Sequence, residues 1–468
     1  MSLMQSRFSI QWHHALALLL FVLPWQTRLI LHRTAWQGGV WEYGTVGVYA
    51  TEILLWGVAL WYVISRLRKK QENTARELHD AQISNKARLC FGLFALWFIY
   101  QIIHAQFPWI EAQALVHFFE AFILWHLITR AHARTRFLQW SFLAGLGTQA
   151  LFALTQFFTQ RAFAFRWLGI TDHPAWAGGS AVIETMSGRW LRAYGGLPHP
   201  NILGGYMAVG ALLVAVQILK MPREKNLREA FGIASLLLFF VALVAGLMVS
   251  FSRSAMLALV CGLIIVTWQH LRKRWRHAHG GSVDSRTEIL HNTQSGMRRV
   301  GMIWFCGVLT ASMFVILQPD LFITRARAQT RLEQQSISER IASYKGACEV
   351  LRRDGFLGTG LGNYTAVLHV LDSSRPGWEY QPVHNALVLA FLELGLIMSL
   401  VLICFLLFAG NTPLLRTRFL AGDWGLFVSL FVLAMFDHYL WSLLSGLVLC
   451  AVVFTLIKPK KTKTDSFG

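Results

Sequence analysis

Charged residues are scarce in this chain, and their scarcity excludes most soluble proteins. Asp, Glu, Lys and Arg make up 14% of the 468 residues, whereas soluble globular proteins carry about 25%. Apolar and aromatic residue types together make up 55%. The composition therefore predicts a polytopic membrane protein and argues against a soluble enzyme, a nucleic-acid-binding protein and a disordered chain.

The chain also lacks cysteine clusters and the common metal and hydrolase motifs. Of its 6 cysteines, all lie in apolar stretches except Cys348, which stands in a polar segment without an obvious disulfide partner. The segments that we assign to the outer face contain no HExxH, GxSxG or Asp-x-Asp motif. We therefore expect no disulfide framework, no metal, no cofactor and no serine-hydrolase chemistry.

Apolar segments of about 20 residues, long enough to cross a bilayer, recur along the whole chain. They predict an all-α protein with about 12 transmembrane helices and one large periplasmic loop. The expected spans are 13–31, 46–64, 89–107, 112–128, 137–158, 199–219, 230–249, 252–270, 300–318, 384–409, 418–436 and 439–457. The parts are then 1–198 with the first five helices and a first outer loop, 199–318 with the next four, the large loop 319–383, and 384–468 with three helices and a basic tail.

Membrane topology explains most of the basic excess. The 43 Lys and Arg residues outnumber the 24 Asp and Glu residues, giving a net charge of +19, and most of them fall in connections on one side. The positive-inside rule makes that side, and both termini, cytoplasmic. In the large outer loop, Ser338 is a suitable N-cap for an amphipathic helix over 339–353 that lies on the membrane or over a site.

Three polar clusters stand at the outer ends of expected spans, and therefore at similar depth. The first runs from Arg192 to His199, Pro200 and Asn201. Pro200 and Asn201 open a helix whose free N–H groups suit an anion. An ordinary capped entry into a membrane helix would have the same sequence.

The second cluster is Ser252-Arg253-Ser254, between two long apolar runs. An arginine in such a turn is costly unless it faces a cavity, a partner or a ligand, and its planar fork suits two phosphate oxygens. The alternative is an arginine that extends to lipid headgroups. Arg340, one turn before Tyr344 on the loop helix, can reach the same region or can simply face solvent.

The third cluster, His384 and Asn385, opens the tenth expected span. A histidine there can exchange protons near neutral pH or donate to an anion, although an isolated one is often only interfacial. Asp437 and His438, in the last outer hairpin, are second-rank candidates. The glycine-rich segment 358–363 follows a loop helix rather than a strand, so we expect a packed turn there and not a nucleotide site.

With these clusters in this order, the chain resembles the O-antigen ligase and O-antigen polymerase superfamily of bacterial envelope glycosyltransferases. The resemblance covers about residues 190–400, and the topology with one large outer loop extends it to the whole chain. It rests on Pro198–Asn201, Ser252–Ser254, Glu339–Tyr344 followed by Gly358–Asn363, and Pro382–Asn385 with Glu393–Gly395.

The resemblance implies an inverting, metal-independent transfer of a glycan from undecaprenyl diphosphate, by a GT-C-like protein, at the periplasmic face of the bacterial inner membrane. Because the leaving diphosphate gains negative charge, arginines and helix N-termini must stabilise it. The expected catalytic residues are Arg253, Arg340 and His384, with His384 acting either as the base or as a donor to the diphosphate. The expected substrate-binding residues are Arg192, His199, Asn201, Ser252, Tyr344, Asn385, Asp437 and His438.

The acceptor distinguishes the alternatives within this fold. The leading interpretation is a ligase that moves the glycan onto lipid A-core, which the size of the 319–383 loop favours modestly. A polymerase that joins one carrier-linked repeat to another is the next alternative, followed by an enzyme that glycosylates a protein. A transporter is a different class, and Glu52 and Glu120, within or near spans, are its best candidate residues.

Overall fold

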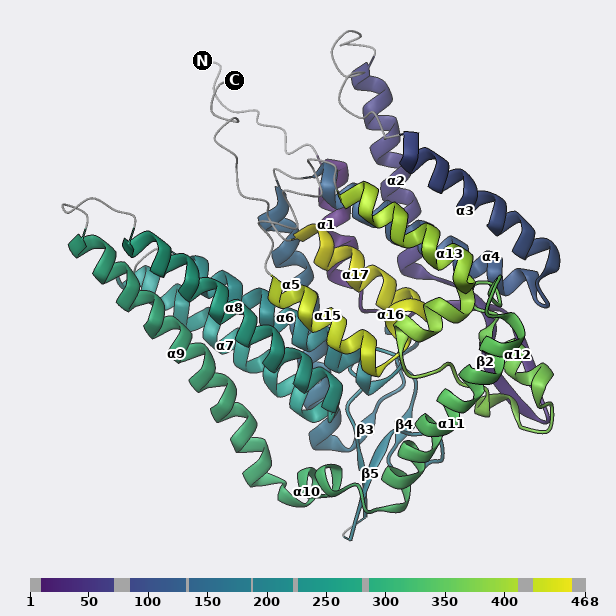
Figure 1. The fold of residues 1–468 in the computed structure, drawn as a ribbon. Coiled ribbons are helices and arrows are strands. Elements are labelled where there is room, and N and C mark those ends of the chain that lie inside the picture. Colours follow the sequence, from purple (N-terminus) through teal and green to yellow (C-terminus); the bar gives the residue numbers. More distant parts are fainter. Residues whose placement is uncertain are drawn as a thin grey trace.

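The computed structural model describes residues 10–70, 85–131, 134–186, 188–221, 226–279, 286–410 and 424–456. Helices form most of the described chain, and the short strands gather with helices α10 to α12 along one edge (Figure 1). The long or apolar helices are α1 (Trp12–Val22), α2 (Ala50–Lys70), α3 (Asn85–His104), α4 (Pro108–Arg130), α5 (Thr135–Thr159), α6 (Pro200–Lys220), α7 (Leu227–Ser250), α8 (Arg253–His279), α9 (Arg286–Leu317), α13 (Ala386–Gly410), α15 (Trp424–Phe436) and α17 (Leu444–Leu456).

Membrane character is confirmed, but the expected count of twelve spans is not. Within the described ranges, eight helices are long and apolar enough to cross a membrane, namely α2, α4 to α9 and α13. Four shorter apolar helices occupy the other expected spans: Trp12–Val22, Gly92–His104, Trp424–Phe436 and Leu444–Thr455. Residues 1–9 and 457–468, the termini that we expect to be cytoplasmic, lie outside the described residues.

Helix α6 is the centre of the bundle, because it is apolar on all faces. Of its apolar window, 94% is buried, and α5, α7, α8 and α15 pack around it. Its N-terminal turn has glycines where neighbours come closest: a Cβ on Gly204 would lie 2.7 Å from Ser252 Cβ, and one on Gly205 would overlap the Tyr439 hydroxyl. These close approaches bring the starts of α6 and α8 and the 437–442 hairpin to one place.

The first expected span, 13–31, is wrong over its second half. Helix α1 ends at Val22, and β1 (Arg28–Trp36) pairs antiparallel with β2 (Gly39–Tyr49). The turn at Gln37 and Gly38 has positive φ at both residues, which is the backbone of a two-residue hairpin turn. Short apolar runs rich in β-branched and aromatic residues do not reveal by hydropathy alone whether they form helix or strand. The second span correspondingly begins at Ala50 rather than at 46.

The 159–198 connection adds further short strands to a fold that we expected to be all-α. It contains β3 (Arg161–Ala162) paired with β4 (His173–Pro174), and β5 (Val182–Thr185) paired with β6 (Gly188–Leu191). A single turn of 3-10 helix, Arg166–Leu168, lies between β3 and β4.

The 319–383 segment is mainly helical. It contains α10 (Pro319–Arg327), α11 (Arg331–Asp354), α12 (Tyr364–Leu371) and the 3-10 turn Gly377–Glu379. The amphipathic helix ends near Asp354 as expected, but it begins at Arg331, seven residues before Ser338. Helices α10 and α11 both contact β5, so this segment and the 159–198 connection form one layer.

The glycine-rich segment forms the expected turn, and it is packed against a break in α13. Gly358 and Gly360 have positive φ, as does Gly395 within α13. Backbone N–H groups of Thr359 and Gly360 donate to the carbonyls of Leu392 and Glu393 at 3.0 and 3.1 Å. Irregular backbone at membrane depth requires such partners. The tenth span is therefore interrupted rather than continuous.

Candidate functional site

Asp437 connects the elements on which the predicted residues lie. It precedes the short helix α16 (Tyr439–Ser442) and is 5% exposed. Its Oδ2 accepts a hydrogen bond from Asn201 Nδ2 (2.9 Å), and its Oδ1 accepts one from the His438 backbone N–H (2.8 Å). The Asp437 carbonyl accepts from the N–H of Ala386, at the start of α13 (3.0 Å). Asp437, only a secondary candidate in the sequence, thus joins α6, α13 and the last hairpin.

His384 and His438 lie beside this carboxylate. Their ring centroids are 5.6 Å apart, and one ligand atom from each of His384, Asp437 and His438 falls within 4.8 Å of the others. His438 is held by Ser442 Oγ at Nδ1 (2.7 Å) and by Tyr43 Oη at Nε2 (3.3 Å). His384 Nδ1 is buried and has no hydrogen-bond partner among the described residues. This geometry suits a reacting or bound group at His384, and also a divalent cation, which the sequence did not predict.

The electrostatics keep the imidazoles neutral and the carboxylate charged. Burial lowers the pKa of His438 to about 4, although Asp437 opposes the shift. Burial also lowers the pKa of His384, with Asp437 opposing and Arg340 adding to the effect. For Asp437, burial alone would raise the pKa, but the neighbouring histidines and Asn201 outweigh it, so that the pKa falls below its ordinary value. At neutral pH the group is an anion beside neutral bases.

His199 is the N-cap of α6. Its Nδ1 accepts from the Asn201 N–H (3.1 Å), so the ring carries its proton on Nε2. The His199 side chain is exposed at the surface of the described chain, and crowding by the surrounding segments together with the charge of Arg192 lowers its pKa. The ring stays neutral and presents one N–H donor at a helix N-terminus, the arrangement expected for anion binding.

Arg192, in the first outer connection, joins the start of α6 to the end of α7. It is 7% exposed, and its Nε donates to the Ser250 carbonyl (3.0 Å) while its Nη2 donates to Asn201 Oδ1 (2.6 Å). Burial and the nearby Arg325 lower its pKa to about 9, so it remains a cation at neutral pH. Asn201 is therefore bonded to Arg192 on one side and to Asp437 on the other.

Arg253 and Arg325 share the buried carboxylate of Glu333. Arg253 Nη2 lies 3.3 Å from Glu333 Oε2, and Arg253 Nη1 donates to the Arg325 carbonyl (2.8 Å). Arg325 forms an ion pair with Glu333 Oε1 and donates to the Phe251 carbonyl (3.0 Å). The Arg253 side chain is still 43% exposed. The sequence analysis missed Arg325 and Glu333, because neither belongs to a motif; the basic run 325–331 was the one available signal.

Arg340 lies within electrostatic range both of the Arg325–Glu333 ion pair and of His384 beside Asp437. Its charge lowers the pKa of Arg325 and the pKa of His384. One turn further along α11, Tyr344 Oη accepts from Asn385 Nδ2 (3.4 Å). The charges of Arg253 and Arg325 also contribute to lowering the pKa of Arg192. Four arginines therefore lie within electrostatic range of one another, and one glutamate, Glu333, partly neutralises them.

Two of the predicted substrate-binding side chains already have structural partners. Asn385 Oδ1 accepts from the N–H groups of Leu387 and Val388 (3.0 and 3.1 Å), which caps α13. Ser252 is 1% exposed, and its Oγ lies 3.3 Å from Ser254 Oγ. Their contact with a substrate stays a prediction.

A cavity of about 310 Å³ opens beside the cluster. It is walled by β2, α4, the 169–173 and 194–198 segments, and the turn that begins α17. Tyr43, which is bonded to His438, and Ser442 line it. Glu393, 3% exposed, also reaches it and accepts from Trp441 Nε1 (2.7 Å), which joins the interrupted α13 to the last hairpin.

Comparison with known proteins gives one family. A family model described as O-antigen ligase matches residues 238–406. The matched part runs from within α7 to within α13, and it includes Arg253, Arg325, Arg340 and His384 but not Arg192 or Asp437. No curated protein and no solved structure matches the chain.

Proposed function

Since the chain carries the O-antigen ligase domain of the O-antigen ligase and polymerase family of membrane glycosyltransferases, we propose that it transfers a glycan from undecaprenyl diphosphate to lipid A-core. The reaction inverts the anomeric carbon and takes place at the periplasmic face of the bacterial inner membrane, with both termini cytoplasmic. The observation that carries the proposal is a convergence of basic residues near Asp437 and Glu333. Arginines come from α8, α10 and α11, and Arg192, His199 and His384 come from the segments just before α6 and α13.

This cluster suits a leaving diphosphate. Arg253 and Arg325 pair with Glu333, and Arg192 lies within electrostatic range of it, so three cations and one anion leave two positive charges. The N-cap of α6 adds the Nε2–H donor of His199. When the glycosidic C–O bond breaks, the bonding electrons move onto the diphosphate, and preorganised cations stabilise that charge without rearranging. Arg253 is the member with both a fixed position and open surface.

His384 supplies the proton chemistry in this proposal. The acceptor hydroxyl attacks the anomeric carbon from the face opposite the diphosphate, and its proton passes to a base. His384 is neutral, and Asp437 lies close enough to stabilise the imidazolium that would form. If His384 instead donates to the diphosphate, Asp437 still orients it.

A reconstituted transfer assay tests the proposal and separates the acceptors. Purified protein receives an undecaprenyl-diphosphate glycan with lipid A-core in one tube and with a second carrier-linked glycan in another. Product on lipid A-core supports the ligase. Longer carrier-linked chains with no lipid A-core product would establish a polymerase, which shares the cluster and differs in its acceptor. Absence of product from folded protein given its native glycan would point to protein glycosylation or transport.

The transfer rate is expected to hold as pH falls from about 7.5 to about 6. Burial lowers the pKa of His438 to about 4 and lowers the pKa of His384 as well, whereas a histidine of ordinary pKa, about 6.5, would be mostly protonated at the lower end. Initial rates across this interval measure the effect. A loss of more than about threefold would show that an essential histidine titrates normally.

The chemical step is expected to need no divalent metal, because arginines already supply the positive charge. Initial rates are measured with EDTA and after adding back Mg²⁺, Mn²⁺ or Zn²⁺. We expect similar rates in all samples at a temperature where the protein stays folded. Loss of transfer in EDTA that a metal restores would contradict this and assign a metal to His384, Asp437 and His438.

A further inference from the structure

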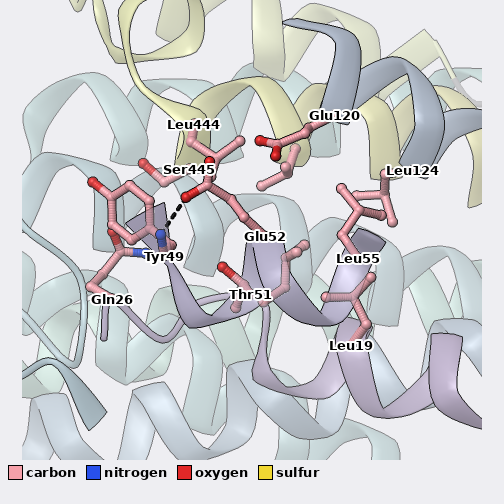
Figure 2. Close-up of a pocket in the computed structure, with 12 residues that line it drawn as sticks. Leu19, Gln26, Tyr49, Thr51, Glu52, Leu55, Glu120, Leu124, Leu444 and Ser445 are labelled. Atoms are coloured by element: carbon pink, nitrogen blue, oxygen red, sulfur yellow. Dashed lines mark hydrogen bonds between the residues drawn. The ribbon is translucent and has the colours of Figure 1, made fainter. Parts of the chain in front are cut away.

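A second polar group lies away from the arginine cluster, within α2 and α4. Glu52 is 5% exposed and Glu120 is 1% exposed, and His117 stands one helical turn before Glu120 on α4. One ligand atom from each of these three residues lies within 4.8 Å of the others. Figure 2 shows the Glu52 and Glu120 carboxylates pointing into the same small pocket.

Hydrogen bonds hold one oxygen of each carboxylate, and the second oxygens point toward His117 and toward each other. Trp56 Nε1 donates to Glu120 Oε1 (2.7 Å), and the Tyr49 backbone N–H donates to Glu52 Oε2. Glu52 Oε1 lies 3.3 Å from His117 Nε2. Glu120 Oε2 and His117 Nε2 are buried and have no hydrogen-bond partner in the described part of the chain. Ligands at metal sites are oriented by outer hydrogen bonds of this kind.

The pocket around these carboxylates is apolar, and the basic group beside them is His117. Its walls include Leu19, Leu55, Leu124 and Val448, and no lysine or arginine stands among its described lining residues. Two carboxylates in contact in such surroundings are costly unless a proton or a metal cation lies between them.

The pocket has room for one ion and a route of entry. Its volume is about 20 Å³, and a single water-sized guest needs about 10–15 Å³ on this measure. Gln26, Tyr49, Leu444 and Ser445 line both this pocket and the 310 Å³ cavity, and His117 lines the larger one. A hydrated cation in the cavity can therefore reach the carboxylates.

We propose that Glu52, His117 and Glu120 bind one divalent transition-metal ion, of which Zn²⁺ is the best match. One imidazole nitrogen and two carboxylate oxygens are donors that zinc accepts, whereas Ca²⁺ and Mg²⁺ prefer oxygen alone. The ion joins α2 to α4 beneath the hairpin of β1 and β2, and so stabilises one wall of the large cavity. The site shares no residue with the arginine cluster, so its removal lowers stability without abolishing transfer.

The test uses untagged, full-length protein in detergent. Each variant is loaded with Zn²⁺, desalted and measured for zinc by plasma mass spectrometry and for its Tm with and without EDTA. We expect about one zinc per chain in the wild type and a Tm that falls in EDTA and recovers with Zn²⁺. Glu120→Gln and His117→Ala should each bind less than about a fifth of that zinc, with a Tm that does not respond to Zn²⁺.

His126→Gln is the matched control, because His126 also lies on α4 but its ring contacts Tyr62. It should bind as much zinc as the wild type. Zinc that remains in Glu120→Gln and disappears in His384→Ala would place the ion in the other histidine group and overturn the proposal. A wild-type protein with no bound zinc and no Tm response to Zn²⁺ would also overturn the proposal. This result uses the wild type alone, so it can be obtained even if a variant fails to fold.

Discussion

Replacing His384 with alanine is expected to leave a protein that inserts and folds but transfers glycan at least about 100-fold more slowly. His384 has a buried Nδ1 without a partner among the described residues, and it lies beside Asp437 at the start of α13. Loss of the imidazole removes either the base or the donor to the diphosphate, while the cap of α13 remains because Asn385 provides it. The measurement is the initial rate in the reconstituted assay, with Tm as the check on folding.

His369→Ala is the control for this variant. His369 belongs to the same 319–383 segment, but its ring stacks on Trp36 (centroids 3.8 Å apart) and packs edge-on against Tyr380, not against His438. It should keep near wild-type transfer. If His384→Ala also kept near wild-type transfer, His384 would be only an interfacial residue, and the proton chemistry would need another group.

Replacing Arg253 with lysine is expected to reduce transfer by about 10- to 100-fold with normal insertion. Lysine keeps the charge but loses the planar guanidinium. That group contacts both Glu333 and the Arg325 carbonyl, and the Arg253 side chain is still partly exposed. If the fork holds the diphosphate, the transfer rate falls while the protein's Tm changes little. Initial rates at saturating donor and the Tm measure the two effects.

Two controls separate binding of the diphosphate from support of the structure. Arg327→Lys changes an exposed arginine on the same short helix as Arg325 and should be nearly silent. Glu333→Gln removes the carboxylate that Arg253 shares. If Arg253 served only to hold α10 and α11 through Glu333, Glu333→Gln would lower transfer and Tm as much as Arg253→Lys does. Unchanged transfer in Arg253→Lys would remove Arg253 from the reaction.

The transporter alternative is weakened by where its residues lie. Glu52 and Glu120 are enclosed with His117 and held by Trp56 and the Tyr49 backbone. This arrangement is better suited to a fixed ion than to a path for a solute. A transporter would require that Glu52→Gln and Glu120→Gln abolish function while His384→Ala does not, the reverse of the expectations above.

Local sequence was sufficient to place most of the elements that hold the arginine cluster. Hydropathy located the long helices, because crossing a bilayer demands an apolar run that no other structure requires at such length. Pro200 opening α6 and the cap at Asn385 follow from neighbouring residues, so they were visible before any tertiary contact was known. The positions of Arg253 and His384 at helix starts followed from the same local signals, whereas Arg340 lies in the middle of α11, which begins earlier than expected.

Other elements could not be predicted in this way, because their outcome depends on partners elsewhere in the chain. Residues 29–31 extend the apolar run of α1, but the segment from Arg28 to Trp36 became β1 because β2 pairs with it and Trp41 is buried against Trp36. Helix α13 is interrupted at Gly395 because the glycine-rich turn supplies the missing hydrogen bonds. Hydropathy within a window cannot register either pairing.

The sequence by itself determined that this is a helical membrane protein and which polar residues stand at its helix ends. Only the tertiary structure decided which of them act together. Asp437 belongs to the site because Asn201, 236 residues earlier, donates a hydrogen bond to it. Glu333 belongs to it because Arg253 and Arg325 both form ion pairs with its carboxylate. Glu52, His117 and Glu120 form a group because α2 packs beside α4. Hydrogen bonds and ion pairs act over a few ångströms in space, so segments distant in sequence reveal them only after the helices have packed.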